Sequence, residues 1–280
     1  MYEHETGVVA ASNNQTLSIK FDAADATELQ TIRVFTLGRF SIQLLTDPEK
    51  NAASGRQQKP QELLQALVSM GGRNISTDSI CYTLWPDAEG DSASNSLDVN
   101  LHRLRRKLGS SKTILASGGR LTINNKIVWV DVWAYEKSLN RIDKLLTQPD
   151  SMRDIALITA LFNKTLEMYQ GSYLSYEPPK SWSLSLRERL RSKTLRHISD
   201  IGLLLENNQD WNDAIRFYQR GLEIDPFAEE LYQRIMTCLK ETDRFAEGIA
   251  MYQRCRTNLS TGLNITPSSK TEGIRKTLYK

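Results

Sequence analysis

A stretch near the C-terminus repeats its own pattern after 34 residues. An aromatic residue, a small residue three positions later and a Tyr-Gln-Arg triplet recur in the same order, first as Trp211, Ala214 and 218–220, then as Phe245, Gly248 and 252–254. Ile201 and Leu205 keep the same offset from Ile235 and Leu239. A small residue lets two helices pack closely. The period therefore indicates helix pairs that stack one after another.

This period and its aromatic and small positions are typical of the tetratricopeptide repeat. Helical spacing of apolar residues also covers 133–146, 154–169 and 183–207, with interruptions at Gly171, Pro178 and Pro179. We therefore expect residues 131–280 to form an all-α, tetratricopeptide-like domain.

The preceding part of the chain, residues 32–130, has a different pattern. Short β-like runs at 32–35 and 40–44 surround Gly38 and predict a hairpin or a small meander. Helical patterns then begin at Pro60, at Ser76 or Thr77, and at Ser92, and further β-like runs follow at 113–116, 121–123 and 127–130. Gly118 and Gly119 separate two of these runs. Helices followed by a glycine-tipped hairpin favour an α+β winged helix-turn-helix domain.

The helix expected at 92–108 has two different faces. Its apolar stripe consists of Ala93, Leu97, Leu101, Leu104 and Leu108, and the arc that we place opposite holds Ser96, Val99, Asn100, Arg103, Arg106 and Lys107. Arginine, asparagine and valine are residue types that contact guanine, adenine and the thymine methyl group in a major groove. The alternative is a solvated helix face whose terminal cations complement the helix dipole.

Several motifs, in their order and spacing, resemble the SARP family of antibiotic regulatory protein-like activators. In that family an OmpR-type winged helix precedes a bacterial transcriptional activator domain. The resemblance covers about residues 32–278 and rests on Leu37-Gly38-Arg39-Phe40, Lys59-Pro60-Gln61-Glu62-Leu63-Leu64, Leu84-Trp85-Pro86-Asp87-Ala88, residues 96–108, Val130-Asp131-Val132-Trp133, residues 169–174 and residues 262–268. It implies a DNA-binding transcriptional activator that acts without a cofactor.

The resemblance also assigns roles to individual residues. It places Ser96, Val99, Asn100 and Arg103 at bases, and it places Arg105, Arg106 and Lys107 at phosphates or the groove edge. Trp85 would donate its indole N–H to phosphate, with a core aromatic as the alternative. Lys59 would contact the DNA backbone or remain a solvated lysine, and Arg120 would enter a minor groove from the hairpin.

The family also suggests partners beyond one DNA site. It implies tandem copies on direct repeats of double-stranded DNA, with homodimer formation or signal input through the helical domain. The loop from Pro86 to Ser92 corresponds to the segment that contacts RNA polymerase. Its acids Asp87, Glu89 and Asp91 suit a basic partner surface, although an ordinary acidic loop has the same composition.

Charge and hydropathy indicate where in the cell the protein acts. The chain has 280 residues and a net charge of +3, but residues 1–31 hold five acids and one lysine, so the remainder carries about +7. We expect residues 1–31 to be a flexible acidic leader. We find no signal-peptide pattern and no apolar run long enough for a membrane span, so we expect a cytoplasmic, nucleoid-associated bacterial protein.

We expect no catalytic or metal site. The sequence has no phosphate-binding Gly-x4-Gly-Lys motif, and the three cysteines and three histidines lack metal-ligand spacing. The basic stretch from Lys180 to Arg196 is either an auxiliary DNA contact or the charged face of a repeat helix. The alternative to a DNA-binding regulator is an interaction scaffold that uses the tetratricopeptide-like surface.

Overall fold

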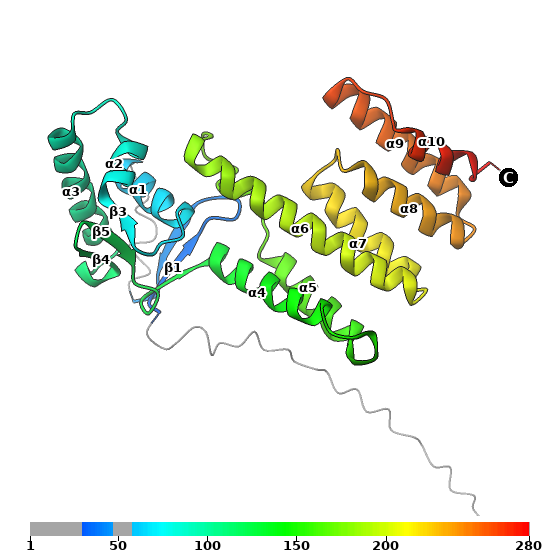
Figure 1. Cartoon of the computed structure of the whole chain (residues 1–280), viewed down its shortest axis with the longest axis horizontal. Helices are drawn as coiled ribbons and strands as arrows, with labels where there is room; N and C mark the ends of the chain where they lie inside the picture. The colour runs from blue at the N-terminus through cyan, green and yellow to red at the C-terminus, as the bar shows by residue number, and fades with distance from the viewer. Residues whose placement is uncertain (1–29, 47–57, 280) are drawn as a thin grey trace, which may run out of the picture.

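The computed structural model describes residues 30–46 and 58–279. Figure 1 shows a small α+β part at one end and, beyond it, helices that stack as far as the C-terminus. Nearly all of the predicted leader lies outside the described residues.

The first sheet joins two distant parts of the chain, with the strand order β2-β1-β6. β1 (Ile32–Phe35) pairs antiparallel with β2 (Ser41–Leu44), and the chain turns at Gly38, whose φ is +98°. β6 (Val128–Val130) lies parallel to β1 on its other side. The hairpin is therefore confirmed, whereas the place of β6 beside β1 was not predicted.

Three helices follow the first hairpin: α1 (Gln58–Ser69), α2 (Thr77–Leu84) and α3 (Gly90–Lys107). α1 ends where Gly71 and Gly72 take φ values of +87° and +69°, a backbone region that glycine enters without a steric penalty. Both helices α1 and α2 pack against α3. This packing directs the apolar stripe of α3 inward.

A second sheet forms the wing, with the order β3-β5-β4. Its strands are β3 (Ile75–Ser76), β4 (Ile114–Ser117) and β5 (Arg120–Ile123), and a short 3₁₀ helix, η2 (Ser111–Thr113), precedes β4. β4 and β5 pair antiparallel around Gly118 and Gly119, whose positive φ values suit a tight hairpin turn. The predicted glycine-tipped hairpin is confirmed.

The rest of the chain is helical. Its elements are α4 (Asp131–Leu146), η3 (Asp150–Met152), α5 (Ile155–Glu167), α6 (Ser181–Asn207), α7 (Trp211–Ile224), α8 (Glu229–Glu241), α9 (Phe245–Leu263) and α10 (Ser269–Lys276). α7 and α9 begin at the two aromatic residues of the repeat. A Cβ atom on Gly202 of α6 would lie 2.3 Å from the ring of Tyr218 in α7, so this close helix contact requires glycine.

The two parts share polar contacts as well as one hydrophobic core. The buried carboxylate of Asp131, the first residue of α4, accepts hydrogen bonds from the backbone N–H groups of Thr36 and Leu37 at 2.7 and 2.8 Å. It also accepts from the Thr36 hydroxyl at 2.6 Å and from the Val132 N–H at 2.7 Å. Burial raises the pKa of Asp131, while these hydrogen bonds oppose the rise. The end of β1 is thereby fixed to α4.

A second contact joins the winged helix to α6. Leu37 forms a β-bridge with Tyr173, and the Tyr173 hydroxyl donates to the carbonyl oxygen of Gln65 in α1 at 2.7 Å. The guanidinium of Arg187 in α6 donates to the carbonyl oxygens of Tyr173 and Leu174, each at 3.0 Å. The segment between α5 and α6 therefore holds the first sheet, α1 and α6 together.

Candidate nucleic-acid interface

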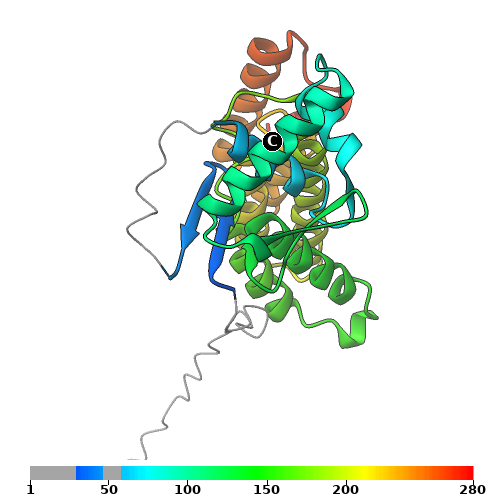
Figure 2. The same cartoon turned by 90° about the vertical axis from the view of Figure 1, so that its left-hand side faces the viewer.

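Helix α3 lies at the end of the molecule that is farthest from the C-terminal repeats, and Figure 2 shows it crossing the face turned towards the viewer. It begins at Gly90, two residues before the predicted start, and its C-cap is Leu108. The predicted apolar stripe is buried along its length, with 0–5% exposure at Ala93, Leu97, Leu101 and Leu104. The opposite side of α3 is exposed at this end of the protein.

Three of the four predicted base-contacting residues are accessible on α3. Val99 is 49% exposed, Arg103 is exposed and Ser96 is half-buried. Within the described parts of the chain, the guanidinium of Arg103 has no hydrogen-bond or ion-pair partner. An exposed arginine and an exposed valine one turn apart provide a bidentate donor and a methyl contact on the same surface.

Asn100 differs from its predicted exposure. Its side chain is only 8% exposed, and its Nδ2 donates to the carbonyl oxygen of Ser96 at 2.7 Å. Asn100 lies about 60° around the helix from Leu97, at the border of the apolar stripe, so its amide faces the protein. Its placement on the arc opposite the stripe was wrong, and in this conformation the amide is not presented to bases.

The cations at the end of α3 divide into two groups. Arg106 is exposed, as a phosphate contact requires, and Lys107 is half-buried, with its pKa lowered by burial. Arg105 instead turns towards the wing, where its Nε and one terminal nitrogen donate to the carbonyl oxygen of Ile114 at 3.0 and 2.6 Å. These bonds tie α3 to β4 and give Arg105 a structural role, while its phosphate contact stays a prediction.

The three DNA-contacting residues that were predicted outside α3 lie on three different elements. Trp85 is the C-cap of α2, is half-buried and packs against the core, which matches the alternative of a core aromatic. Lys59 lies inside the first turn of α1, with its Nζ 3.1 Å from a carboxylate oxygen of Glu62. Arg120 is exposed beside the hairpin tip, and it donates to the carbonyl oxygen of Asn74 at 3.0 Å.

The predicted polymerase-contact acids lie along the start of α3. Asp87 and Glu89 are exposed in the loop after α2, whereas Asp91 is exposed within the first turn of α3. A carboxylate at a helix N-terminus is stabilised by the helix dipole. Asp91 therefore has a local stabilising role whether or not it contacts a partner.

Sequence reasoning missed three exposed side chains on the same face of α3. Asn95, Asp98 and His102 are exposed beside Val99 and Arg103. An Asn amide can pair with adenine, and an Asp carboxylate can accept from cytosine. The helical wheel that placed Val99 opposite the stripe also places these residues there, so the signal was present in the sequence.

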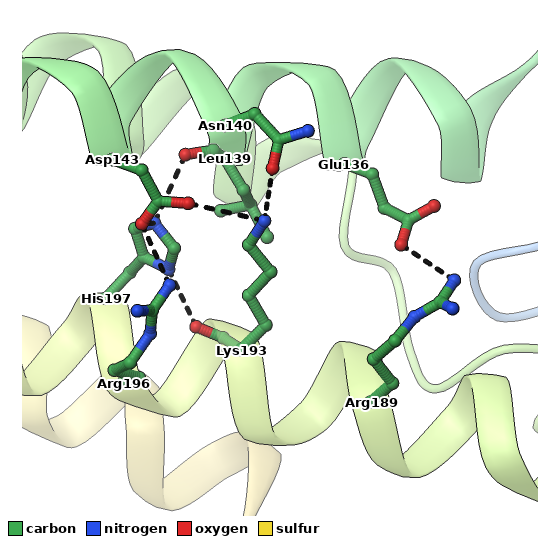
Figure 3. A network of polar contacts seen from close by, with 8 residues as sticks. All are labelled: Glu136, Leu139, Asn140, Asp143, Arg189, Lys193, Arg196 and His197. Atoms are coloured by element: carbon green, nitrogen blue, oxygen red, sulfur yellow. Dashed lines mark hydrogen bonds and ion pairs between the residues drawn. The ribbon is translucent and has the colours of Figure 1, made fainter.

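The basic stretch from Lys180 to Arg196 forms ion pairs within the chain. Arg189 pairs with Glu136 of α4 at 2.9 Å, and Arg196 pairs with Asp143 of α4 at 2.8 Å, as Figure 3 shows. Arg191 pairs with Glu188 and with Asp225. These cations therefore fasten α6 to its neighbours, which agrees with the expectation of a charged repeat helix.

Other kinds of site find little support in residues 30–46 and 58–279. These residues contain no group of three or more potential metal ligands and no helix long and apolar enough to cross a membrane. Burial raises the pKa values of Cys238 and Cys255 to about 12, and burial together with two nearby carboxylates raises that of Cys81. Such thiols are poor nucleophiles at neutral pH.

Comparison with known proteins gives two family matches. Residues 130–278, more than half of the chain, match the bacterial transcriptional activator domain, and residues 56–119 match the domain described as transcriptional regulatory protein, C terminal. No curated protein sequence matches the chain. The matched regions coincide with the helical part and with most of the winged helix.

A solved structure gives a similar fold over most of the chain. It is Mycobacterium tuberculosis EmbR in complex with a low-affinity phosphopeptide, with a TM-score of 0.65 and 16% sequence identity. The match covers 89% of this chain but 65% of the EmbR chain. At this identity the similarity is one of fold, and it confirms the predicted order of a winged helix followed by an all-α repeat domain.

Proposed function

The chain belongs to the family of the bacterial transcriptional activator domain, in the SARP-like arrangement with an N-terminal winged helix, and on this premise we propose that it regulates transcription by binding specific double-stranded DNA through α3. The observation that carries the proposal is the exposed face of α3. Val99, Arg103 and Arg106 lie there, and within the described chain neither arginine is engaged by an acid. A scaffold has no need for such a face.

Different parts of α3 contact bases and phosphates. Arg103, with Val99 and Ser96, contacts base edges near the middle of the helix, while Arg106 and Lys107 contact phosphates near its end. Arg120 at the hairpin reaches the adjacent minor groove. Tandem copies bind direct repeats, and the helical domain supports homodimer formation or receives a signal. A bacterial cytoplasmic location is part of the same proposal.

We expect DNA affinity to fall steeply with salt. Residues 101–112 contain five cations and no acid. If about six phosphates are neutralised, the slope of log affinity against log salt is about −5. Fluorescence anisotropy with a labelled duplex measures this slope. A slope near zero would remove the DNA-binding proposal and favour the interaction scaffold.

We also propose that the protein activates transcription by recruiting RNA polymerase through Asp87, Glu89 and Asp91. These exposed carboxylates lie at the opposite end of α3 from its cations, so both surfaces can be used at once. Replacing Asp87 and Glu89 with Asn and Gln should reduce activated transcription in vitro while DNA affinity changes little. Unchanged transcription would remove this part of the proposal. Asp91 is left intact because its loss also weakens the helix terminus.

A further inference from the structure

An open pocket lies between the C-terminal end of α4, the segment around η3 and the second half of α6. Its volume is about 340 Å³, which lies within the range of about 300–1,000 Å³ that is usual for small-molecule sites in proteins. Leucine side chains from α4 and α6 line part of it, and the charged side chains in its walls are Asp143, Arg153, Arg196 and Asp200. The pocket therefore combines apolar surface with charges of both signs.

The apolar part of the pocket consists of three leucines. Leu146 of α4 and Leu204 of α6 are half-buried, and Leu203 of α6 is 38% exposed. Covering such surface with an aliphatic group is favourable by about 25 cal/mol for each Å² that is removed from water. Because the pocket is small and the leucines line only part of it, they suit a ligand with a short aliphatic chain.

The two aspartates of the pocket differ in what they contact. Asp143 lies 2.8 Å from a guanidinium nitrogen of Arg196 and 3.4 Å from the Nζ of Lys193, and Figure 3 shows both contacts. Asp200 is half-buried on α6, and within the described residues no hydrogen bond or ion pair engages it. A carboxylate that has lost part of its water and has no partner attracts a cationic group. Asp200 is therefore the carboxylate that remains available to an ammonium group.

The two arginines of the pocket retain donors that no acceptor uses. Arg196 bonds to Asp143 through one terminal nitrogen, and its other N–H groups have no acceptor within the described chain. Arg153 is held in place by the carbonyl oxygen of Gln148 and a carboxylate oxygen of Asp150, each at 2.8 Å, and its Nε is buried without an acceptor. Guanidinium groups bind carboxylates through charge-assisted hydrogen bonds. The pocket therefore also offers a place for a carboxylate.

We propose that this pocket binds a free aliphatic amino acid, of the size of valine, leucine or isoleucine. The ammonium group pairs with Asp200, the carboxylate accepts from Arg196 beside the charge of Arg153, and the aliphatic chain packs on the leucines. An anion without an ammonium group leaves Asp200 unpaired, and a cation without a carboxylate is repelled by two guanidinium groups. A purely apolar molecule takes water from these charges and returns no hydrogen bond. A zwitterion with an aliphatic chain satisfies all three parts of the pocket.

The test is an NMR titration of the ¹⁵N-labelled full chain with L-valine, L-leucine and L-isoleucine, each up to about 10 mM, which nearly saturates a site with a Kd of about 1 mM. We expect saturable shifts in residues 143–153 and 196–204 with at least one of the three. For the tightest of them, the amide, which lacks the carboxylate, and the deaminated acid, which lacks the ammonium group, should each bind about tenfold or more weakly. No saturable shift in these residues, or an analogue that binds as tightly as the amino acid, would overturn the proposal.

Two variants test the charged contacts, with one matched control. Asp200→Asn breaks no contact within the described chain, so it should fold normally and bind the amino acid about tenfold or more weakly. Arg196→Gln should also weaken binding, whereas Arg189→Gln, which likewise breaks an ion pair between α6 and α4 but outside the pocket, should leave the affinity unchanged. Full affinity of Asp200→Asn, or equal affinities of the two arginine variants, would overturn the assignment of the charges. Binding is measured without DNA, so the result does not depend on the proposed regulation of transcription.

Discussion

Replacing Asp131 with alanine is expected to lower the free energy of unfolding by about 3–5 kcal/mol. The carboxylate accepts from three backbone N–H groups and one hydroxyl, and it is 3% exposed. The N–H groups of Thr36 and Leu37 would remain buried without an acceptor, at about 1–3 kcal/mol each. The change also releases the end of β1 from α4, and β1 is the central strand of the first sheet.

Chemical denaturation of the two proteins measures this effect. Asp154→Ala is the matched control, because the Asp154 side chain also accepts a backbone N–H, that of Leu157 at 2.9 Å, but at an exposed helix N-cap. Its loss should cost about 1 kcal/mol. If Asp131→Ala costs no more than Asp154→Ala, the buried carboxylate does not hold the two parts together.

Arg103→Ala is expected to weaken binding to the preferred DNA site by about 1–3 kcal/mol and to relax the preference at one base position. The reason is its place near the middle of α3, on the exposed face, with no internal partner within the described chain. Arg106→Ala should weaken all DNA sequences similarly and reduce the salt slope by about one. Binding to a preferred and to a scrambled duplex distinguishes the two effects.

Arg105→Ala provides the contrast on the same helix. Its guanidinium is bonded to the Ile114 carbonyl oxygen, so the main effect should be a loss of stability at the wing of about 1 kcal/mol. Arg103→Ala and Arg106→Ala remove no buried group and should leave melting nearly unchanged. Equal weakening of both duplexes by Arg103→Ala would make Arg103 a phosphate contact. A large fall in its melting temperature would mean that the faces of α3 are misassigned.

The parts of the fold that could be predicted depend on local pattern. The 34-residue repeat predicted the starts of α7 and α9, because each helix pair packs mainly on its neighbours. The glycine pair at 118–119 predicted the wing hairpin, because a tight turn needs positive φ. The apolar spacing in α3 predicted its buried stripe, because the helical period places those residues on one face.

Long-range partners could not be read from such patterns. β6 lies beside β1 although more than 90 residues separate them, and Asp131 receives the N–H of Thr36 across 95 residues. On α3, helical periodicity predicts the direction in which a side chain points but not the group that it contacts. Arg105 meets a strand carbonyl, and the Asn100 amide bonds back to its own helix.

The central claim is that α3 reads a DNA sequence, and selection of bound duplexes from a random pool tests it most directly. We predict enrichment of one short motif, present in two copies of the same orientation with centres about one helical turn apart. The same selection with Arg103→Ala should recover the motif with one degenerate position. Recovery of DNA with no enriched motif, by a protein that is folded and monodisperse, would contradict the claim.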